Sequence, residues 1–217
     1  MSNYLRLKKM LYVVSLAAIS IVLSLIEITW PVPGFNFLKI DFSEVAILVA
    51  ILVLGTKETL VVVLIRTITR RLFRGWSPDE LVGEMLAMFA SFSIILGYAI
   101  AKKVLKQNER PLFYEVSVNH EKMKISEFII FTSFITLSLS ITLWLINFLF
   151  ATPFYFSYFT GDIHFSVFTW IPNAQFPNIT SFMWFTIAGY FPFNITKGIL
   201  VSIIFLLLKP RLKYLEL

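Results

Sequence analysis

Long apolar runs recur along most of the chain, and they constrain its fold more than any other feature of the sequence. Hydrophobic residues make up 58% of the 217 residues, charged residues only 15%, and the mean hydropathy is +0.80. A helix of about 20 apolar residues crosses the roughly 30 Å hydrocarbon core of a bilayer while satisfying its own backbone hydrogen bonds. We therefore predict an all-α, multi-pass protein of the cell membrane, built as one integral membrane domain over residues 1–217.

The apolar runs and the charges between them predict six transmembrane helices with both termini in the cytoplasm. The expected spans are 10–27, 42–54, 59–73, 81–101, 128–151 and 192–208. One long helix over 42–65 would place Lys57 and Glu58 near the bilayer centre at a cost of a few kcal/mol each, so Gly55-Thr56-Lys57-Glu58 is interpreted as a tight cytoplasmic turn. Six spans keep most Lys and Arg residues in the cytoplasm, whereas five spans would reverse that balance.

Two connecting segments differ in composition. Residues 102–127 are polar and charged, which indicates a cytoplasmic connector. Residues 152–180 are rich in Phe, Tyr and Trp, with Pro153, Pro172 and Pro177 along them, and are expected to form an extracellular loop. This loop either packs as an aromatic belt on the helix ends or covers a binding site, and the two roles are compatible.

A group of arginines follows the third apolar run. Arg66, Arg70 and Arg74 are spaced by four residues and share one face of a helix, with Arg71 beside them. The six-span topology puts them on the extracellular half, against the usual bias of cations toward the cytoplasm. Their guanidinium groups suit a carboxylate or a phosphate, and the alternative is that they extend into the lipid headgroup layer.

The last apolar run contains a second polar group. Because proline is tolerated in the first turn of a helix, we predict that the last span begins at Pro192. Asn194 and Lys197 then lie on one face, well below the outer surface. A lysine at that depth indicates a functional site, and the alternative is a structural ion pair with Asp41, Glu44 or Glu84.

Further polar residues lie within or beside the apolar runs on the same extracellular half. Asp41 and Glu44 open the second span, where Asp41 is expected to cap the helix, while Glu84 and Asn147 lie inside later spans. The predicted substrate-binding residues are Asp41, Glu44, Arg66, Arg70, Glu84, Asn147, Asn194 and Lys197. They predict a polar pocket for a small planar or anionic solute, ringed by Trp30, Trp76, Trp144 and Trp170.

The sequence contains none of the common catalytic or metal-binding motifs. There is no G-x-x-x-x-G-K-[ST], H-E-x-x-H or G-x-S-x-G pattern, and there is no cysteine. His120 and His164 lie in loops predicted on opposite sides of the membrane. We therefore expect no enzyme activity, no catalytic residues, no metal site and no nucleic-acid partner.

Four segments together resemble a known family. They resemble segments of the substrate-binding S component of energy-coupling factor (ECF) vitamin transporters, and most of all of its riboflavin-type subgroup. The four segments are Lys39 to Glu44, Gly83-Glu84, Leu145 to Phe148 and Pro192 to Gly198. The resemblance implies the six-helix S-component fold and an outward-facing pocket. The vitamin would be the transported substrate, with no cofactor, and the partners would be a transmembrane coupling subunit and two cytoplasmic ATPases.

The resemblance also implies docking through small residues on the first helix. The candidates are Ser15, Ala17, Ala18, Ser20 and Ser24, with Ser20 and Ser24 at a small-xxx-small spacing.

The chain departs from the riboflavin-type pattern at two places. Arg66-Thr67 stands where that pattern has Lys-Asn, and no Asn follows Gly83-Glu84 among Leu86, Ala87 and Met88. Four arginines favour an anion. The first hypothesis is that the chain is an S component for riboflavin or a related flavin. The second is that it is an S component for an anionic vitamin such as pantothenate. The third is that it is a lipid-phosphate-binding accessory or enzyme subunit of the membrane.

Overall fold

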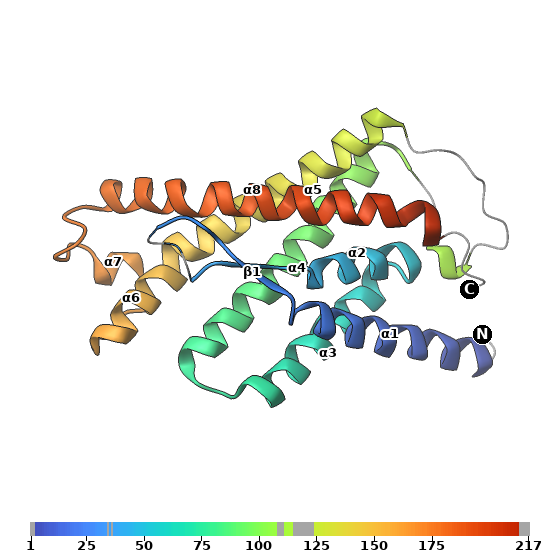
Figure 1. Ribbon diagram of the computed structural model, residues 1–217, viewed down its shortest axis with the longest axis horizontal. Helices are drawn as coiled ribbons and strands as arrows, with labels where there is room; N and C mark the ends of the chain where they lie inside the picture. Colours follow the sequence, from blue (N-terminus) through green and yellow to red (C-terminus); the bar gives the residue numbers. More distant parts are fainter. Residues whose placement is uncertain (1–2, 34, 36, 108–110, 115–123, 213–217) are drawn as a thin grey trace.

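The computed structural model describes residues 3–33, 35, 37–107, 111–114 and 124–212, which form a bundle of helices with a short β hairpin at its side (Figure 1). The elements in chain order are α1 (Asn3–Leu23), β1 (Glu27–Thr29), β2 (Lys39–Asp41), α2 (Ser43–Val53), α3 (Thr56–Arg74), α4 (Pro78–Val104), the 3-10 turn η1 (Leu112–Tyr114), α5 (Ile125–Ile146), the π-helical turn η2 (Asn147–Ala151), α6 (Thr152–Thr160), α7 (Val167–Trp170) and α8 (Ile179–Leu212). Residues 108–110 and 115–123, in the predicted connector 102–127, lie outside the described residues.

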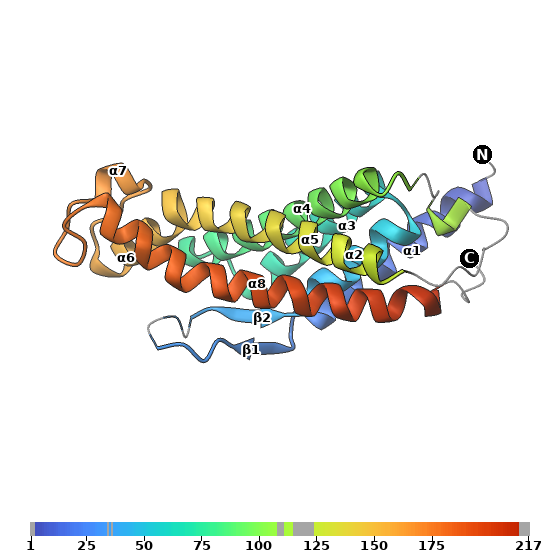
Figure 2. The same cartoon turned by 90° about the horizontal axis from the view of Figure 1, so that it is seen from above.

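The helices run back and forth between two ends of the molecule. One end holds the first turn of α1, the turn between α2 and α3 and the last turn of α8. The other end holds α6, α7 and the first turn of α8 (Figures 1 and 2). An ion pair between Lys9 of α1 and Glu58 of α3 joins two helix starts at the first end.

Helix α2 is the centre of the bundle. It is only 11 residues long, and nearly all of its side chains are buried against α1, α3, α4 and α8. The N-cap residue of α2 is Phe42 and not the predicted Asp41, but Asp41 Oδ1 accepts the backbone N–H of Ser43 at 2.9 Å from one residue before the cap. Its last turn leads into Gly55, where φ is +91° and the chain reverses into α3. The predicted chain reversal between the two helices is thus confirmed at Gly55, but residues 56–58, which were predicted to belong to the turn, form the start of α3.

Three described helical segments are long and apolar enough to cross a membrane: Pro78–Val104, Ile125–Thr160 and Ile179–Leu212. Helix α5 packs against α4 on one side and α8 on the other. Glycines permit this close approach, because a Cβ at Gly97 would lie 2.6 Å from the Phe134 carbonyl oxygen and a Cβ at Gly198 would lie 2.9 Å from Thr136 Cα.

The prediction that the last helix begins at Pro192 is wrong. Helix α8 begins at Ile179, and Pro192 lies in its interior. Proline removes one backbone donor from a helix, but α8 packs extensively against α5, and this packing favours a continuous helix. Asn194 and Lys197 therefore lie in the middle of a 34-residue helix rather than in its first turns.

The prediction of an irregular loop over residues 152–180 is also wrong. Helix α5 continues through η2 into α6, so one helical segment runs from Ile125 to Thr160. Pro153 cannot donate a backbone hydrogen bond, and the π-helical turn just before it accommodates the altered pattern. Helix α7 and the start of α8 occupy much of the remainder.

The first predicted span ends too late, and the chain is not purely helical. Helix α1 ends at Leu23, and residues 27–29 form β1, which pairs antiparallel with β2 in the register Glu27 opposite Asp41. Between the strands, Phe35 packs over Gly189 of α8, where any side chain at position 189 would collide with its ring. The hairpin therefore lies alongside α8 (Figure 2).

Candidate functional site

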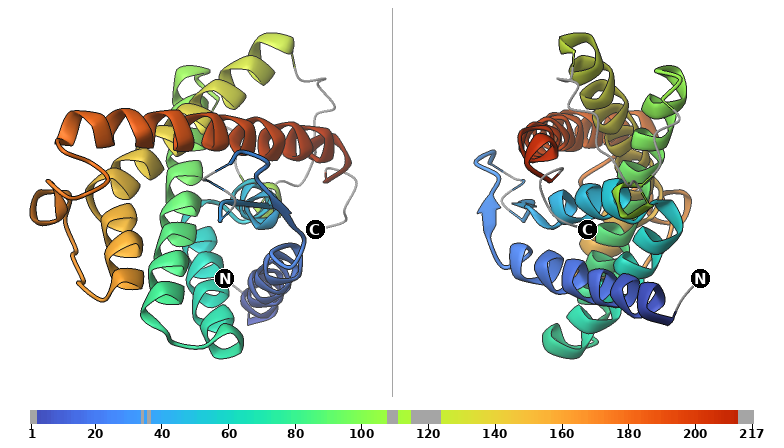
Figure 3. Two further views of the ribbon diagram at one scale, coloured as in Figure 1. Left: turned by 60° about the vertical axis from the view of Figure 1, so that its left-hand side comes forward. Right: turned by 90° about the vertical axis from the view of Figure 1, so that its right-hand side faces the viewer.

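A cavity of about 750 Å³ lies where the hairpin, α3, α4, α5, η2, α6 and α8 meet. Helices α3 and α4 run side by side to the turn that joins them, and their ends near that turn form one wall (Figure 3). The hairpin contributes Lys39 and Asp41, and the middle of α8 contributes Asn194 and Lys197. A volume of this size is in the range of pockets that hold small organic ligands, about 300–1,000 Å³.

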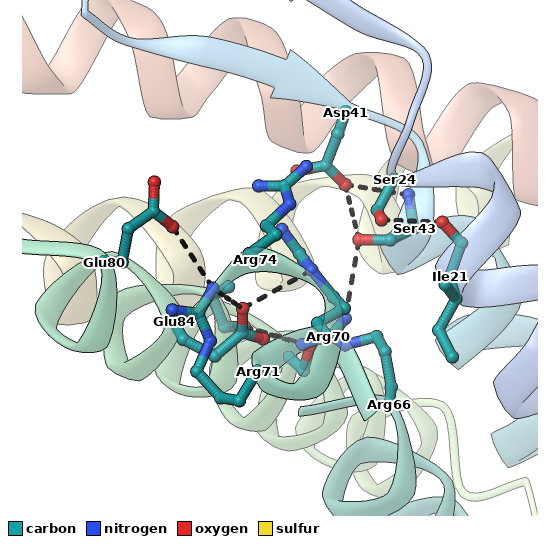
Figure 4. Close-up of polar contacts among 12 residues, drawn as sticks. Ile21, Ser24, Asp41, Ser43, Arg66, Arg70, Arg71, Arg74, Glu80 and Glu84 are labelled. Carbon is teal, nitrogen blue, oxygen red and sulfur yellow. Dashed lines mark hydrogen bonds and ion pairs between the residues drawn. The ribbon is translucent and has the colours of Figure 1, made fainter. Parts of the chain in front are cut away.

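The arginines of α3 are paired with carboxylates. Glu84 of α4 lies between Arg70 and Arg71, with Oε2 3.4 Å from Arg70 Nε and 3.3 Å from an Arg71 terminal nitrogen. Glu80 adds a second partner for Arg71 at 3.2 Å. Figure 4 shows these side chains converging from the two helices. Arg70, Arg71 and Glu84 are all buried, so their charges interact in a medium of low polarity.

Glu27 ties the hairpin to α3. Its carboxylate accepts from Lys39 Nζ at 2.6 Å and from Arg74 at 3.0 Å. Burial raises the pKa of Glu27, but the two cations outweigh it and hold the pKa below its usual value. The carboxylate is therefore ionised at neutral pH, and Arg74 is paired like its neighbours.

Lys197 lies between two carboxylates. Its Nζ is 3.5 Å from Asp41 Oδ2 and 3.2 Å from Glu44 Oε1, so the ion-pair alternative predicted from the sequence is present. Ser43 donates to both Asp41 and Glu44. Arg66, which is fully buried behind the cavity wall, donates to Ser43 Oγ at 3.4 Å and to the Ala87 carbonyl at 3.1 Å.

Asn194 has an unsatisfied amide in the cavity wall. Its side chain is 1% exposed, and neither Nδ2 nor Oδ1 has a hydrogen-bond partner among the described residues. Asn147 differs, because its Nδ2 donates to the Leu143 carbonyl at 2.8 Å. Aromatic side chains complete this side of the cavity: Tyr155, Phe156, Phe159, Tyr190 and Phe193.

The charges that line the cavity balance. Five cations and five carboxylates contribute to the lining: Lys39, Arg70, Arg71, Arg74 and Lys197 against Glu27, Asp41, Asp79, Glu80 and Glu84. Arg66 and Glu44, of opposite charge, lie behind the wall. The cavity is therefore polar but has no net charge from its described lining. No group of three or more side chains able to ligate a metal is found in the described part of the chain.

The structure brings most of the predicted site residues together. Of the eight, six line the cavity: Asp41, Arg70, Glu84, Asn147, Asn194 and Lys197. Glu44 pairs with Lys197 from behind the lining, and Arg66 donates there to Ser43 and to the carbonyl of Ala87. The predicted ring of Trp30, Trp76, Trp144 and Trp170 is wrong, since none of the four is part of the lining. Trp144, for example, stacks on Phe148 and donates to Thr186.

Sequence reasoning missed several lining residues on α6 and α8. Tyr190 lies four residues before Asn194 and seven before Lys197, and these three side chains share one helix face. If the helix had been predicted to continue through Pro192, Tyr190 would have been predicted on the same face as Asn194 and Lys197. The same continuation past Pro153 would have placed Tyr155 beside Thr152 and Asn147.

The predicted docking residues of α1 divide into two groups. Ser15 and Ala18 are exposed, whereas Ala17, Ser20 and Ser24 are buried within the chain. Ser20 Oγ donates to the Ser43 carbonyl of α2 at 3.1 Å. The Ser20/Ser24 pair is therefore buried against this chain's own bundle, and docking through the predicted residues stays a prediction.

The helices thus form a membrane bundle with a cavity of a size that suits a small solute. The chain belongs to the family of ECF transporter substrate-specific components, whose family model matches residues 8–209. It is accordingly a multi-pass membrane protein of a transport system, and the family consists of transporter components rather than enzymes.

Its relatives are bacterial transport proteins. The chain is 27% identical over 210 residues to the riboflavin transporter FmnP of Bacillus subtilis, covering 96% of this chain and 94% of FmnP. It is 24% identical to the riboflavin transporter RibU of Streptococcus thermophilus (95% and 83% covered) and 28% identical to RibU of Staphylococcus aureus (94% and 90% covered).

Two solved structures share its fold. The S component of a bacterial ECF transporter superposes with a TM-score of 0.63 at 24% identity, over 95% of this chain and 96% of that one. The S component for biotin gives a TM-score of 0.50 at 16% identity, over 96% and 94%.

Proposed function

We propose that this protein is the riboflavin-binding subunit of an ECF importer. It captures riboflavin from outside the cell in the cavity between the hairpin, α3, α4, α6 and α8. Six helices, α1 to α5 and α8, cross the membrane, and both termini are cytoplasmic. A transmembrane coupling subunit and two cytoplasmic ATPases drive release into the cell. The names of its relatives support the choice of a flavin.

The observation that carries the proposal is a cavity with balanced charges and one unsatisfied amide. Riboflavin is neutral, with a planar ring system whose edge presents both N–H donors and carbonyl acceptors. Asn194 offers a buried donor and acceptor without partners, and Tyr155, Tyr190 and Phe193 offer rings against which a planar ligand can pack. The six predicted lining residues, among them Asp41 and Lys197, are proposed as riboflavin-binding residues.

The pantothenate alternative is weaker because the arginines have partners. Arg70, Arg71 and Arg74 each lie within 3.4 Å of a carboxylate of this chain. A pantothenate carboxylate would have to compete with those carboxylates, and displacing Glu84 from Arg70 and Arg71 would leave a buried carboxylate unpaired. Lipid phosphate would meet the same competition, so nothing in the geometry favours the third hypothesis.

Titration of the purified protein tests the proposal. Riboflavin fluorescence is quenched when its ring stacks on aromatic side chains, so binding is read directly in detergent. We expect saturable 1:1 quenching by the wild-type protein and no competition from pantothenate. Binding of pantothenate without binding of riboflavin would overturn the proposal.

Uptake tests the partnership. In a riboflavin-requiring host that lacks its own importer, we expect growth on low riboflavin only when this chain is expressed together with a coupling subunit and active ATPases. Growth supported by this chain alone would contradict the proposed ATP-driven assembly.

A further inference from the structure

Glu84 has an unusual position in the cavity wall. Its side chain is 4% exposed, and one oxygen, Oε2, pairs with two guanidinium groups, those of Arg70 and Arg71. Arg71 has a second carboxylate partner in Glu80, but Glu84 supplies the one ion pair that Arg70 makes among the described residues. The remaining oxygen of Glu84 and the NH1 group of Arg70 have no hydrogen-bond partner there. Neutralising Arg70 therefore depends on Glu84.

This dependence sets how the cavity responds to a charged ligand. With Glu84 ionised, the described lining carries no net charge. A phosphate monoester carries a charge of about −1.5 to −2 at neutral pH. Such a group could reach the NH1 group of Arg70, but it would then lie beside the buried, negatively charged Glu84, and it must also lose its own water. A neutral ligand meets neither cost.

We propose that Glu84 is the specificity-determining residue that makes the cavity take neutral riboflavin in preference to riboflavin 5′-phosphate. This inference rests on the proposed function, because it concerns the choice between two flavins at the same site. The four arginines thus do not select an anion. Carboxylates paired with Arg70, Arg71 and Arg74 hold the wall together and repel phosphate, and Glu84 contributes most because it pairs with two arginines and is the most buried of the three carboxylates.

Removing the charge of Glu84 should reduce the preference for riboflavin over riboflavin 5′-phosphate. In Glu84→Gln, the lining gains one positive charge and Arg70 loses its carboxylate partner, whereas Arg71 keeps Glu80. The charge acts at short range in a poorly polar environment, so it changes the binding of a dianion strongly and that of neutral riboflavin weakly. Arg70→Gln should act in the opposite direction, because it leaves Glu84 in excess.

The test is the ratio of two dissociation constants, that of riboflavin 5′-phosphate over that of riboflavin, measured by fluorescence quenching on the full-length purified protein at pH 7.5. The variants are Glu84→Gln, Arg70→Gln, the double variant Arg70→Gln/Glu84→Gln and Glu58→Gln. Glu58 is the matched control, because it is an ion-paired glutamate at the other end of the bundle and does not line the cavity.

We expect the wild-type ratio to exceed one and to fall about tenfold or more in Glu84→Gln, a change that matches one unit charge at close range. The ratio should return toward the wild-type value in the double variant, rise in Arg70→Gln and stay unchanged in Glu58→Gln. A wild-type ratio of one, an unchanged ratio in Glu84→Gln or an equal shift in Glu58→Gln would overturn the inference. If Glu84→Gln does not fold, an unchanged ratio in Arg70→Gln overturns it instead.

Failure of the proposed function gives a different result. Wild-type protein that binds neither flavin contradicts the riboflavin assignment itself. Wild-type protein that binds riboflavin, with a ratio insensitive to Glu84, leaves that assignment intact and rejects only the role of Glu84.

Discussion

Asn194 is the residue whose role in binding can be separated most clearly from a role in stability. Its amide makes no hydrogen bond within the described chain, so Asn194→Ala removes no internal contact of that kind. We expect riboflavin binding to weaken by about 1–3 kcal/mol, roughly fivefold to 150-fold, because the ligand loses a buried partner. Calorimetric titration measures the loss, with the exposed Asn3→Ala as the control. Unchanged affinity would show that the amide does not contact the ligand.

Lys197 should behave differently, because it holds the protein together as well as lining the cavity. Lys197→Met leaves the buried carboxylate of Glu44 and the partly buried carboxylate of Asp41 without their shared cation. Removing one partner of a buried pair typically costs about 3–5 kcal/mol. We expect a marked fall in melting temperature in detergent, together with loss of riboflavin binding. A melting temperature equal to that of wild type would contradict the structural part of this role.

The sequence predicts which polar residues belong to the site better than it predicts which partners they pair with. Asn194, Lys197 and Glu84 are recognisable because a polar group within an apolar run requires a partner. Which partner each finds depends on how the helices pack. The charge balance around Glu84 could not be predicted, since it requires α3 and α4 to lie side by side at their joined ends. For the same reason the arginines suggested an anion until their carboxylates were located.

At the scale of helices, Gly97 controls the contact between α4 and α5. A Cβ there would lie 2.6 Å from the Phe134 carbonyl oxygen and 2.7 Å from Ile135 Cα, and these backbone atoms cannot move independently of α5. Gly97→Ala should therefore destabilise the protein by about 1–3 kcal/mol, even though alanine favours a helix by about 1 kcal/mol. Gly83→Ala in the same helix meets only the Tyr155 hydroxyl at 3.3 Å and should cost less. Thermal unfolding of the two variants compares them, and equal stability would refute the packing argument.

Helix boundaries were predicted poorly wherever proline lies inside a helix. Pro153 and Pro192 were interpreted as helix starts or loop residues, because proline is unfavourable in an isolated helix. In the bundle, the π-helical turn η2 precedes Pro153, and α8 packs against α5, so tertiary packing favours helix where proline alone disfavours it. The hairpin was missed for another reason. Its strands are three residues each, too short for an alternating pattern to be recognised.

At the scale of the whole molecule, the path of the chain supports the proposed orientation. The start of α1, the α2–α3 turn and the end of α8 lie at one end, with the cations Lys9, Lys57 and Lys209 on those segments (Figure 1). Cations in short loops near spans favour the cytoplasmic side. The cations that depart from this rule, Arg70, Arg71 and Arg74, are paired with carboxylates, which removes most of the conflict. The cavity then lies toward the outside.

The orientation can be measured directly because the sequence contains no cysteine, so one introduced thiol gives an unambiguous signal. Phe165, between α6 and α7, is 61% exposed, and Lys57 is exposed in the first turn of α3 at the opposite end. If the termini are cytoplasmic, a membrane-impermeant maleimide should label Phe165→Cys in intact cells and Lys57→Cys only after permeabilisation. The cysteine-free parent reports background. Labelling of Lys57→Cys in intact cells, with Phe165→Cys protected, would invert the orientation, place the cavity on the cytoplasmic side and exclude capture of riboflavin from outside.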